Sequence, residues 1–283
     1  MLRAYPMQCT TITEPRTIML TLRALQLYPI KAIAGITLDV AAVELRGLRG
    51  DRCWLLVDAD GRFLSQRELP ALGAIEAALQ PGGLMVTAAG MPPLALSQPT
   101  GVDRIAVTVW SDTVQALLAE PAANQWFSTL LGQAVRAVFM DAAATRPLDP
   151  ACSLAGDEVS FADGFPLLIA NESSLADLNA RIGEPLAMAR FRPNLVINGA
   201  EPWAEDGWRR LRIGAIEMDL VKPCSRCQVT TLDPSSGVPH PHQEPLRTLA
   251  RFRKQNGKVM FGVNAIARGT GELRCGQPVE VLA

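Results

Sequence analysis

The alternation of apolar and polar residues predicts a chain built mainly from short strands. The alternation is clearest in 104–110, Arg-Ile-Ala-Val-Thr-Val-Trp, which turns at Ser111-Asp112 into a further strand. Two hairpins are predicted before it: 55–57 with 62–64 around an Asp-Ala-Asp-Gly turn, and 84–87 with 94–96 around a Gly-Met-Pro-Pro turn. Short strands at this spacing indicate a small barrel or sandwich.

Helical periodicity appears from residue 120 onward. A helix is predicted from Glu120-Pro121 to Gly132, because proline suits the first turn and glycine the C-terminal cap. A second is predicted over 174–182, with Ser174 and Asp177 spaced as a variant of the capping box, and a third over 245–253. The apolar run 213–221 is predicted to be a strand, and 228–232, Gln-Val-Thr-Thr-Leu, is β-prone.

These patterns predict an α+β protein that is mainly β. Residues 1–18 lack periodicity and are predicted to be a loosely held tail. A mainly β domain is predicted over 19–118 and a mixed β/α domain over 119–283. A chain of 283 residues is long enough for two domains that each bury a core.

Composition narrows the range of functions. The sequence is 48% hydrophobic and 19% charged, which is ordinary for a globular protein, and its formal net charge is -1. That balance gives no reason to expect a nucleic-acid partner or an acidic membrane surface. No apolar run approaches the ~20 residues that span a bilayer, and the N-terminus lacks the apolar stretch of a signal peptide. We therefore expect a cytoplasmic protein.

Six cysteines are spread along the chain: Cys9, Cys53, Cys152, Cys224, Cys227 and Cys275. This spacing is unlike a disulfide scaffold, so most are expected to be reduced thiols. Cys53 and Cys275 are interpreted as small core residues. The stretch 222–227, Lys-Pro-Cys-Ser-Arg-Cys, calls for a chemical explanation, since thiolates bind soft or high-valent metals and the neighbouring Arg226 favours the thiolate.

The residues leave several interpretations of this cysteine pair open. A zinc finger would need three to five residues between its histidines, whereas His240 and His242 are separated by one. A thioredoxin-type pair would begin a helix, which the β-prone sequence after Cys227 disfavours. Two structural thiols in a strand are the remaining interpretation, and it is favoured for Cys224.

Several separated motifs resemble one family. They are Tyr-Pro-Ile-Lys (28–31), Gly-Asp-Arg-Cys-Trp (50–54), Ser-Gln-Arg-Glu (65–68), Phe-Arg-Pro-Asn-Leu-Val-Ile (191–197), Trp-Ala-Glu-Asp-x-Trp (203–208), Lys-Pro-Cys-Ser-Arg-Cys (222–227) and Asp-Pro (233–234). In this order they resemble MOSC-domain proteins with a MOSC N-terminal β-barrel domain, a group that includes the mitochondrial amidoxime-reducing components and their bacterial counterparts. The resemblance covers residues 21–283 and implies a β-barrel domain followed by a barrel-like MOSC domain with a few helices.

The resemblance also implies a molybdenum cofactor bound through molybdopterin. Its metal ligand and catalytic residue would be Cys227, the second cysteine of the motif. The positions that match the family's cofactor-binding residues are Lys31, Arg52, Asp163, Gly164, Phe165, Arg192, Asn194, Ser225, Arg226 and Asn264. Arginine and lysine suit the terminal phosphate of molybdopterin, and Asn194 could instead brace its loop. Where relatives have serine after the lysine, this chain has Ala32. At the superfamily level, pyridoxal phosphate binding is a further implied property.

The implied activity is reduction of N-hydroxylated compounds such as hydroxylamines, N-hydroxylated bases and amidoximes. Nothing after Cys275 could hold an iron–sulfur cluster, so a separate electron donor of the ferredoxin or flavin-reductase type is expected. His240 and His242 are interpreted as part of a Pro-rich surface loop rather than a proton relay. Two alternatives remain: a cofactor carrier or sulfur-transfer protein with a persulfide on Cys227, and a module that binds an anionic ligand without turnover.

Overall fold

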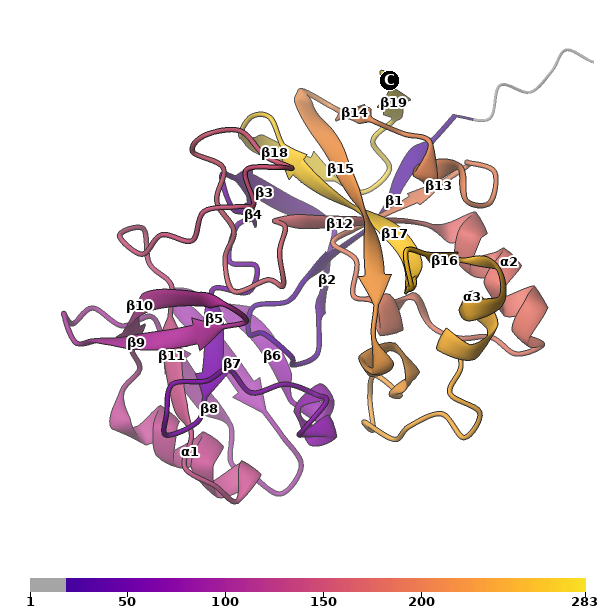
Figure 1. Ribbon diagram of the computed structural model, residues 1–283. Helices are drawn as coiled ribbons and strands as arrows, with labels where there is room; N and C mark the ends of the chain where they lie inside the picture. The colour runs from indigo at the N-terminus through magenta and orange to yellow at the C-terminus, as the bar shows by residue number, and fades with distance from the viewer. Residues whose placement is uncertain (1–18) are drawn as a thin grey trace, which may run out of the picture.

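The computed structural model describes residues 19–283, so the tail predicted over 1–18 and Cys9 lie outside the described residues. The chain folds into two lobes (Figure 1). The small lobe comprises residues 49–140, and the large lobe comprises the other described residues. The prediction of a mainly β, α+β protein is confirmed: the described chain forms nineteen strands and three α-helices.

The large lobe is built around a nine-stranded sheet. The strands run in the order β19-β14-β15-β17-β12-β13-β1-β2, with β16 paired to β17. Their bounds are β1 (Thr21–Leu27), β2 (Ile36–Leu38), β12 (Leu167–Asn171), β13 (Leu195–Asn198), β14 (Arg210–Ile213), β15 (Ile216–Arg226), β16 (Lys254–Gln255), β17 (Lys258–Ala267) and β19 (Val279–Val281). A three-stranded sheet accompanies it: β18 (Gly271–Arg274), β3 (Val40–Glu44) and β4 (Gly47–Leu48).

The first four strands of the chain therefore belong to the large lobe. β1 pairs antiparallel with β13, and β3 pairs with β18, so the beginning of the described chain is joined to its second half. The division predicted at residue 118 remains a prediction. The chain passes from the large lobe to the small lobe near residue 49 and returns after residue 140 (Figure 1).

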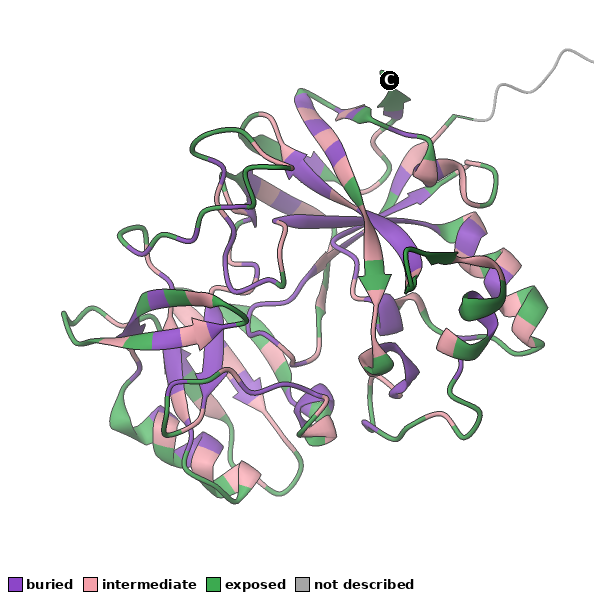
Figure 2. Ribbon diagram, viewed as in Figure 1, coloured by how far each residue is buried: buried purple, intermediate pink, exposed green. Residues whose placement is uncertain are grey.

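The centre of the large sheet is buried on both faces. All five residues of β12 are buried, and β12 runs parallel to β13. Leu167 and Ile169 join the main core, whereas Ala170 packs with Phe191 and Phe261 in a cluster beneath the helices. A strand covered on both faces has an apolar sequence without alternation, as 167–170 does. Figure 2 shows this continuous buried stretch.

Two helices, α2 (Glu172–Ile182) and α3 (Leu246–Phe252), cover one side of this sheet (Figure 1). Both were predicted within two residues of their observed bounds. The capping prediction for α2 was wrong: Asn171 is the N-cap and accepts a hydrogen bond from the Ser173 amide at 3.0 Å. Ser174 is buried and bonds the Glu205 carboxylate, so it is not available as a cap.

The small lobe contains two antiparallel sheets and one helix. One sheet has the order β5-β11-β10-β9 and the other β6-β7-β8. The bounds are β5 (Trp54–Val57), β6 (Glu76–Gln80), β7 (Gly83–Thr87), β8 (Leu94–Ser97), β9 (Arg104–Val109), β10 (Asp112–Leu118), β11 (Arg136–Phe139) and α1 (Pro121–Leu131). The predicted β7–β8 and β9–β10 hairpins are confirmed, as is the helix capped by Gly132.

Other local predictions were only partly right. The strand predicted over 62–64 is reduced to an antiparallel bridge between Phe63 and Val57, and the Phe63 amide bonds Thr108 instead of continuing the hairpin. The run 213–221 is not one strand, because a turn at Gly214, with φ of 58°, separates β14 from β15.

The β-prone stretch 228–232 forms a single 3-10 turn, η4 (Gln228–Thr231). The hydroxyl of Thr230 donates to the Cys227 carbonyl at 2.9 Å, and that of Thr231 donates to the Gln228 carbonyl at 2.7 Å. Threonine hydroxyls that bond the backbone three residues earlier stabilise such a turn against an extended strand. The other 3-10 segments are η1 (Pro70–Ala74), η2 (Met188–Phe191) and η3 (Ala204–Asp206).

Candidate cofactor site

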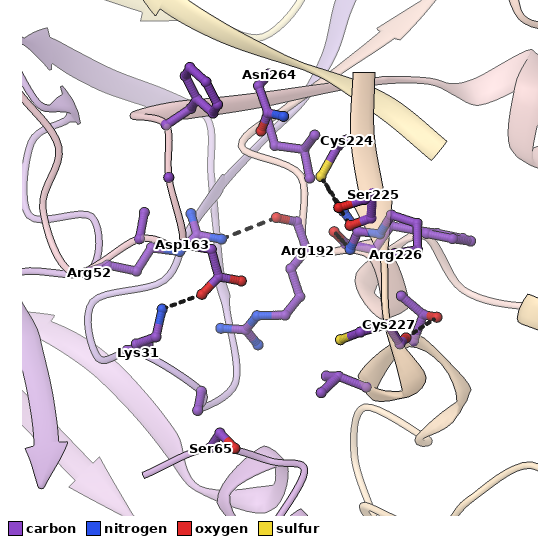
Figure 3. Close-up of a pocket in the computed structure, with 18 of the residues that line it drawn as sticks. Lys31, Arg52, Ser65, Asp163, Arg192, Cys224, Ser225, Arg226, Cys227 and Asn264 are labelled. Atoms are coloured by element: carbon purple, nitrogen blue, oxygen red, sulfur yellow. Dashed lines mark hydrogen bonds and ion pairs between the residues drawn. The ribbon is translucent and has the colours of Figure 1, made fainter. Parts of the chain in front are cut away.

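A pocket of about 510 Å³ lies between the two lobes. The large lobe contributes the ends of β15 and η2, a residue of β17 and the loop before β12, and the small lobe contributes the loop after β5 and the β9–β10 turn. All eleven residues predicted for the site line this pocket: Lys31, Arg52, Asp163, Gly164, Phe165, Arg192, Asn194, Ser225, Arg226, Cys227 and Asn264. Figure 3 shows most of them facing a common space.

The end of β15 is irregular where it reaches the pocket. Its pairing with β17 shifts register between Leu220 and Lys222 and again between Pro223 and Ser225. Bulges of this kind redirect side chains and are common beside functional sites. Opposite the second shift lies Gly262, with φ of 75°; a Cβ there would be 2.8 Å from the Ile169 carbonyl oxygen. Glycine therefore permits the close approach of β17 to β12.

The two cysteines of the motif occupy different parts of the pocket wall (Figure 3). Cys224 lies on β15, and its sulfur accepts a hydrogen bond from the Arg226 guanidinium at 2.9 Å. Cys227 follows the strand as the N-cap of η4. The guanidinium beside its sulfur comes from the small lobe, because Arg67 Nη2 lies 3.5 Å from Cys227 Sγ. Arg226, the neighbouring guanidinium noted in the sequence, therefore bonds the sulfur of Cys224, whereas Arg67 lies beside that of Cys227.

The alternatives for the cysteine pair can be compared with this geometry. A thioredoxin-type pair begins an α-helix, whereas Cys227 is followed by a single 3-10 turn, which disfavours that interpretation. His240 bonds the Glu184 carboxylate and is not part of the pocket lining. Within residues 19–283, no three His, Cys, Asp or Glu side chains lie close enough to share a metal ion. Cys53, Cys152, Cys224, Cys227 and Cys275 are free thiols.

The pocket is strongly cationic. Within the described chain, its lining contains seven basic side chains and a single carboxylate, that of Asp163; the basic residues are Lys31, Arg52, Arg67, Arg190, Arg192, Lys222 and Arg226. The protein as a whole has a formal net charge of -1, so this concentration of positive charge is local. Such a concave cationic surface attracts an anionic ligand.

Arg192 is only partly satisfied by the protein. Nη1 donates to the Ile33 carbonyl at 2.6 Å, and the guanidinium stacks 4.2 Å from the centre of the Tyr28 ring. Nη2 is buried and has no hydrogen-bond partner among the described residues. Burial lowers the pKa of Arg192 to about 10. A buried, unpaired donor carrying positive charge favours an anionic partner such as a phosphate.

Arg52 is held in place by the protein. Its Nη1 donates to Asp51 at 2.6 Å and to Asn194 Oδ1 at 3.1 Å. Its guanidinium carbon lies 4.3 Å from the centre of the Tyr28 ring, which Arg192 also contacts. Asn194 is 1% exposed and also bonds the Leu168 amide and the Gln26 carbonyl. Asn194 therefore braces Arg52 and the neighbouring backbone.

Lys31 and Asp163 form an ion pair at 2.5 Å near Arg52, across the pocket from the two cysteines (Figure 3). Burial lowers the pKa of Lys31, and the nearby Asp163 opposes that change. Desolvation raises the pKa of Asp163, but the charge and hydrogen bond of Lys31 outweigh it and hold the carboxyl below its usual range. Trp110 adds a hydrogen bond from Nε1 to Asp163 at 3.2 Å. Each charge of the pair thus favours the ionised form of the other.

Backbone strain is concentrated around the pocket. Four lining residues other than glycine have positive φ angles: Ala32 (72°), Arg52 (47°), Trp110 (58°) and Arg192 (53°). Residues in this conformation are uncommon, and they persist where the surrounding structure or a ligand fixes the backbone. Ala32, the position where relatives have serine, therefore has the same unusual conformation as three charged or aromatic neighbours.

Several pocket residues were not predicted as site residues: Phe63, Ser65, Gln66, Arg67, Trp110, Arg190, Lys222, Cys224, Val229 and Thr230. Ser65, Gln66 and Arg67 belong to one of the motifs that carry the resemblance, which was the signal available. Trp110 was seen only as the end of an alternating strand. Its hairpin turn places it at the pocket, 46% exposed, and no local pattern indicates that.

Comparison with known proteins gives the family. A model of the MOSC N-terminal β-barrel domain matches residues 19–134, and a model of the MOSC domain matches residues 156–280. Together they cover the lobes that form the pocket. The chain belongs to the MOSC-domain proteins that carry the MOSC N-terminal β-barrel domain.

Curated relatives are similar over most of this chain. It is 33% identical to mitochondrial amidoxime-reducing component 1 of Homo sapiens, over 93% of this chain and 83% of that protein. It is 33% identical to mitochondrial amidoxime reducing component 2 of Rattus norvegicus, over 92% of this chain and 82% of that protein. It is 30% identical to a molybdenum cofactor sulfurase of Oryza sativa, of which it spans 34%. The family and its relatives' names indicate a molybdenum-related function.

The pocket fits a molybdopterin-type group. Such a group carries a phosphate, for which the unpaired Nη2 of Arg192 and the excess of basic side chains are suitable partners. It also binds a soft or high-valent metal, for which the accessible thiols of the same wall are suitable ligands.

Proposed function

We propose that this protein is a molybdenum-cofactor-dependent oxidoreductase that reduces N-hydroxylated compounds, with Cys227 as the protein's metal ligand. The observation that carries the proposal is the placement of the Cys227 thiol at the edge of a pocket with seven basic side chains and one carboxylate in the described chain. The amidoxime-reducing relatives, at 33% identity, point to the substrate class.

In this proposal the cofactor, when bound, supplies the two-electron chemistry, and the protein supplies binding and orientation. Arg192 and Arg52 would hold the phosphate, with Tyr28 fixing both guanidinium planes. Asn194 would act by bracing Arg52. The Asp163–Gly164–Phe165 loop and Asn264 would border the pterin, with Lys31 fixing the loop through Asp163 and the Phe161 carbonyl.

Ser225 and Arg226 would lie beside the metal ligand. Ser225 is exposed, whereas Arg226 is tied to the Phe191 carbonyl at 2.7 Å and to Cys224. Arg226 would therefore mainly hold the end of β15 that carries Cys224 in place.

The net reaction is R–NH–OH + 2e⁻ + 2H⁺ → R–NH₂ + H₂O. The N–O bond breaks, and the electrons come from a separate donor protein of the ferredoxin or flavin-reductase type.

We also propose a cytoplasmic location. No helix within residues 19–283 is both long and apolar enough to cross a membrane.

A second candidate is cofactor transfer or sulfur transfer with a persulfide on Cys227. The observation that favours it is the second thiol of the same pocket, Cys224, together with a relative named molybdenum cofactor sulfurase. The two candidates differ in turnover with an N-hydroxylated substrate, because a carrier would bind the cofactor without reducing one.

The proposal is tested by incubating the cofactor-loaded protein with benzamidoxime and a chemically reduced dye as electron donor. The expected result is catalytic formation of benzamidine, many turnovers per chain. Protein with stoichiometric molybdenum that forms no benzamidine would contradict the reductase and leave the carrier.

A further inference from the structure

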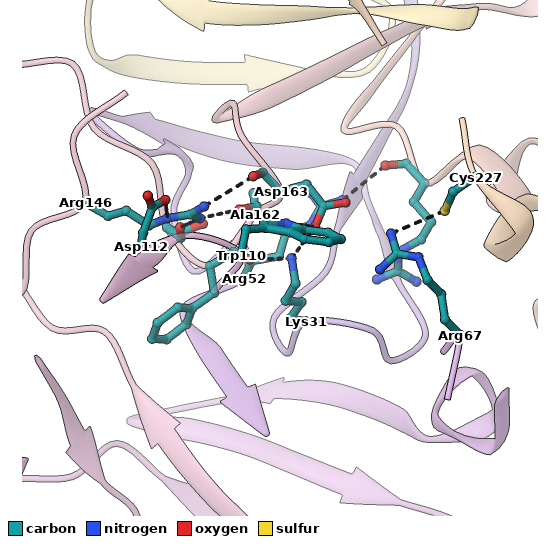
Figure 4. Close-up of polar contacts among 12 residues, drawn as sticks. Lys31, Arg52, Arg67, Trp110, Asp112, Arg146, Ala162, Asp163 and Cys227 are labelled. Carbon is teal, nitrogen blue, oxygen red and sulfur yellow. Dashed lines mark hydrogen bonds and ion pairs between the residues drawn. The ribbon is translucent and has the colours of Figure 1, made fainter. Parts of the chain in front are cut away.

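Arg67 connects the small lobe to the sulfur of Cys227. Its Nη2 lies 3.5 Å from Cys227 Sγ, although the two residues are 160 positions apart in the chain. Its guanidinium carbon lies 4.7 Å from the centre of the Trp110 ring, and Trp110 Nε1 bonds Asp163. Figure 4 shows Arg67 reaching from the small lobe toward Cys227, with Trp110 and Asp163 beside it.

Arg67 differs from the other arginines of the pocket in its partners. Arg52, Arg190, Arg192 and Arg226 each donate to at least one protein oxygen. Within residues 19–283, Arg67 has no hydrogen bond or ion pair to an oxygen; its contacts are the Cys227 sulfur and the Trp110 ring. A guanidinium has five N–H donors, so most of those of Arg67 remain available to a ligand.

Trp110 fixes this arrangement at the mouth of the pocket. Its backbone φ of 58° belongs to a strained turn, and its indole is anchored by the hydrogen bond to Asp163. A guanidinium this close to an aromatic ring is attracted to it, which limits the positions that the side chain adopts. Trp110 therefore restricts Arg67, whose Nη2 lies beside the sulfur.

We propose that Arg67 is the oxygen-binding residue of the reaction and that Trp110 is its positioning residue. This inference rests on the proposed function for the identity of the oxygen, which is the hydroxyl oxygen of the N-hydroxylated substrate. The two electrons from the separate donor protein break the N–O bond, so that oxygen gains negative charge and leaves as water with two protons from solvent. A charged donor oriented toward it stabilises this charge, so substrates whose oxygen is a strong acceptor or an anion are preferred.

The placement of Arg67 can be tested without turnover, by alkylating cofactor-free protein with iodoacetate and with iodoacetamide. Both reagents need the Cys227 thiolate, so the ratio of their rates cancels the thiolate population and reports attraction of the anionic reagent. Trypsin cleaves after Arg226, which puts Cys224 and Cys227 on different peptides for mass spectrometry. We expect Arg67→Gln to lower the iodoacetate-to-iodoacetamide ratio at Cys227 about fivefold at low salt.

Three comparisons make the result specific. Arg67→Lys should keep most of the preference for iodoacetate, and so should Arg62→Gln, which removes an exposed arginine of the same segment. The ratio at Cys224, whose guanidinium partner is Arg226, should not change in Arg67→Gln. An unchanged ratio at Cys227, or an equal fall at both cysteines, would overturn the placement.

The role toward substrate is tested in cofactor-loaded protein. Arg67→Gln should keep its molybdenum and lose at least about tenfold in kcat/KM for benzamidoxime, and Trp110→Ala should lose less, with Trp110→Phe restoring most of it. Loss of molybdenum from Arg67→Gln would instead assign Arg67 to the cofactor and overturn the inference. Failure of the wild type to turn over benzamidoxime would defeat the proposed function while leaving the alkylation result intact.

Discussion

The strand end that carries Cys224 and the turn that carries Cys227 are separated by two residues, yet they belong to different environments. Cys224 sits on β15, and its guanidinium partner, Arg226, is two residues away on the same strand. Cys227 caps η4 and meets Arg67 of the other lobe. A bulged strand followed by a tight turn therefore gives two identical side chains different neighbours. The difference indicates one local, structural thiol and one thiol placed where the lobes meet.

The largest expected effect separates the two thiols by activity. Cys227→Ser should lower the rate of benzamidoxime reduction roughly a thousandfold or more, because it removes the proposed metal ligand. Cys224→Ala should stay within about threefold of the wild type, since Arg226 keeps its bond to the Phe191 carbonyl. Steady-state rates per chain, measured with the same reduced dye, would show whether the losses are instead equal.

A second test concerns the cationic end of the pocket rather than the thiols. Arg192→Ala removes the buried Nη2 that has no partner within residues 19–283 and should weaken cofactor retention about 10- to 100-fold. Retained molybdopterin can be followed by the fluorescence of its oxidised pterin after dialysis. Arg23→Gln removes an arginine that is 64% exposed on β1 and should retain cofactor like the wild type. Retention by Arg192→Ala at the wild-type level would exclude Arg192 from the phosphate site.

The strand geometry beneath Cys224 has its own test. Gly262→Ala combines a φ of 75° with a Cβ 2.8 Å from the Ile169 carbonyl oxygen, whereas Gly90→Ala has a similar φ and no neighbour within 4 Å. We expect Gly90→Ala to lower the free energy of unfolding by about 1–2 kcal/mol and Gly262→Ala by at least ~1 kcal/mol more. Urea unfolding of both variants makes the comparison, and equal losses would mean that β17 moves away from β12 freely.

Cys53 supplies a reference for the two pocket thiols. Burial, reinforced by Asp51, raises the pKa of Cys53 to about 12, so this thiol stays protonated at pH 8 and should be the slowest of the five described cysteines to react with iodoacetamide. The unfolded chain loses this proton near pH 9, whereas the folded chain keeps it. Stability should therefore fall as the pH rises from about 9 to 12. A Cys53→Ala variant should show a shallower decline over that range.

The elements themselves were largely predictable from local pattern. The helix from Pro121 to Leu131 and the β7–β8 hairpin follow from proline, glycine and periodicity, which are properties of neighbouring residues. The failures occurred where side chains bond the local backbone. Thr230 and Thr231 convert a β-prone sequence into a 3-10 turn, and Asn171 rather than Ser174 caps α2.

The site was predictable only through the family motifs. Those motifs named eleven residues, and the structure brings all eleven to one pocket, but their roles remain proposals. Spacing in the sequence cannot show that Arg67 reaches Cys227 or that Trp110 faces Asp163, because both contacts join the two lobes across long stretches of chain. Pairs such as β1–β13 also join the first and second halves of the chain within the large lobe, which local pattern does not indicate.

The most direct test of the account is the molybdenum and zinc content of protein purified from a host that makes the cofactor. Wild type, Cys224→Ala and Cys227→Ala would be compared side by side. We expect about one molybdenum per chain in the wild type, most of it kept by Cys224→Ala and nearly all of it lost from Cys227→Ala. Zinc in place of molybdenum, no metal in the wild type, or equal loss from both variants would contradict a single metal-binding thiol at Cys227.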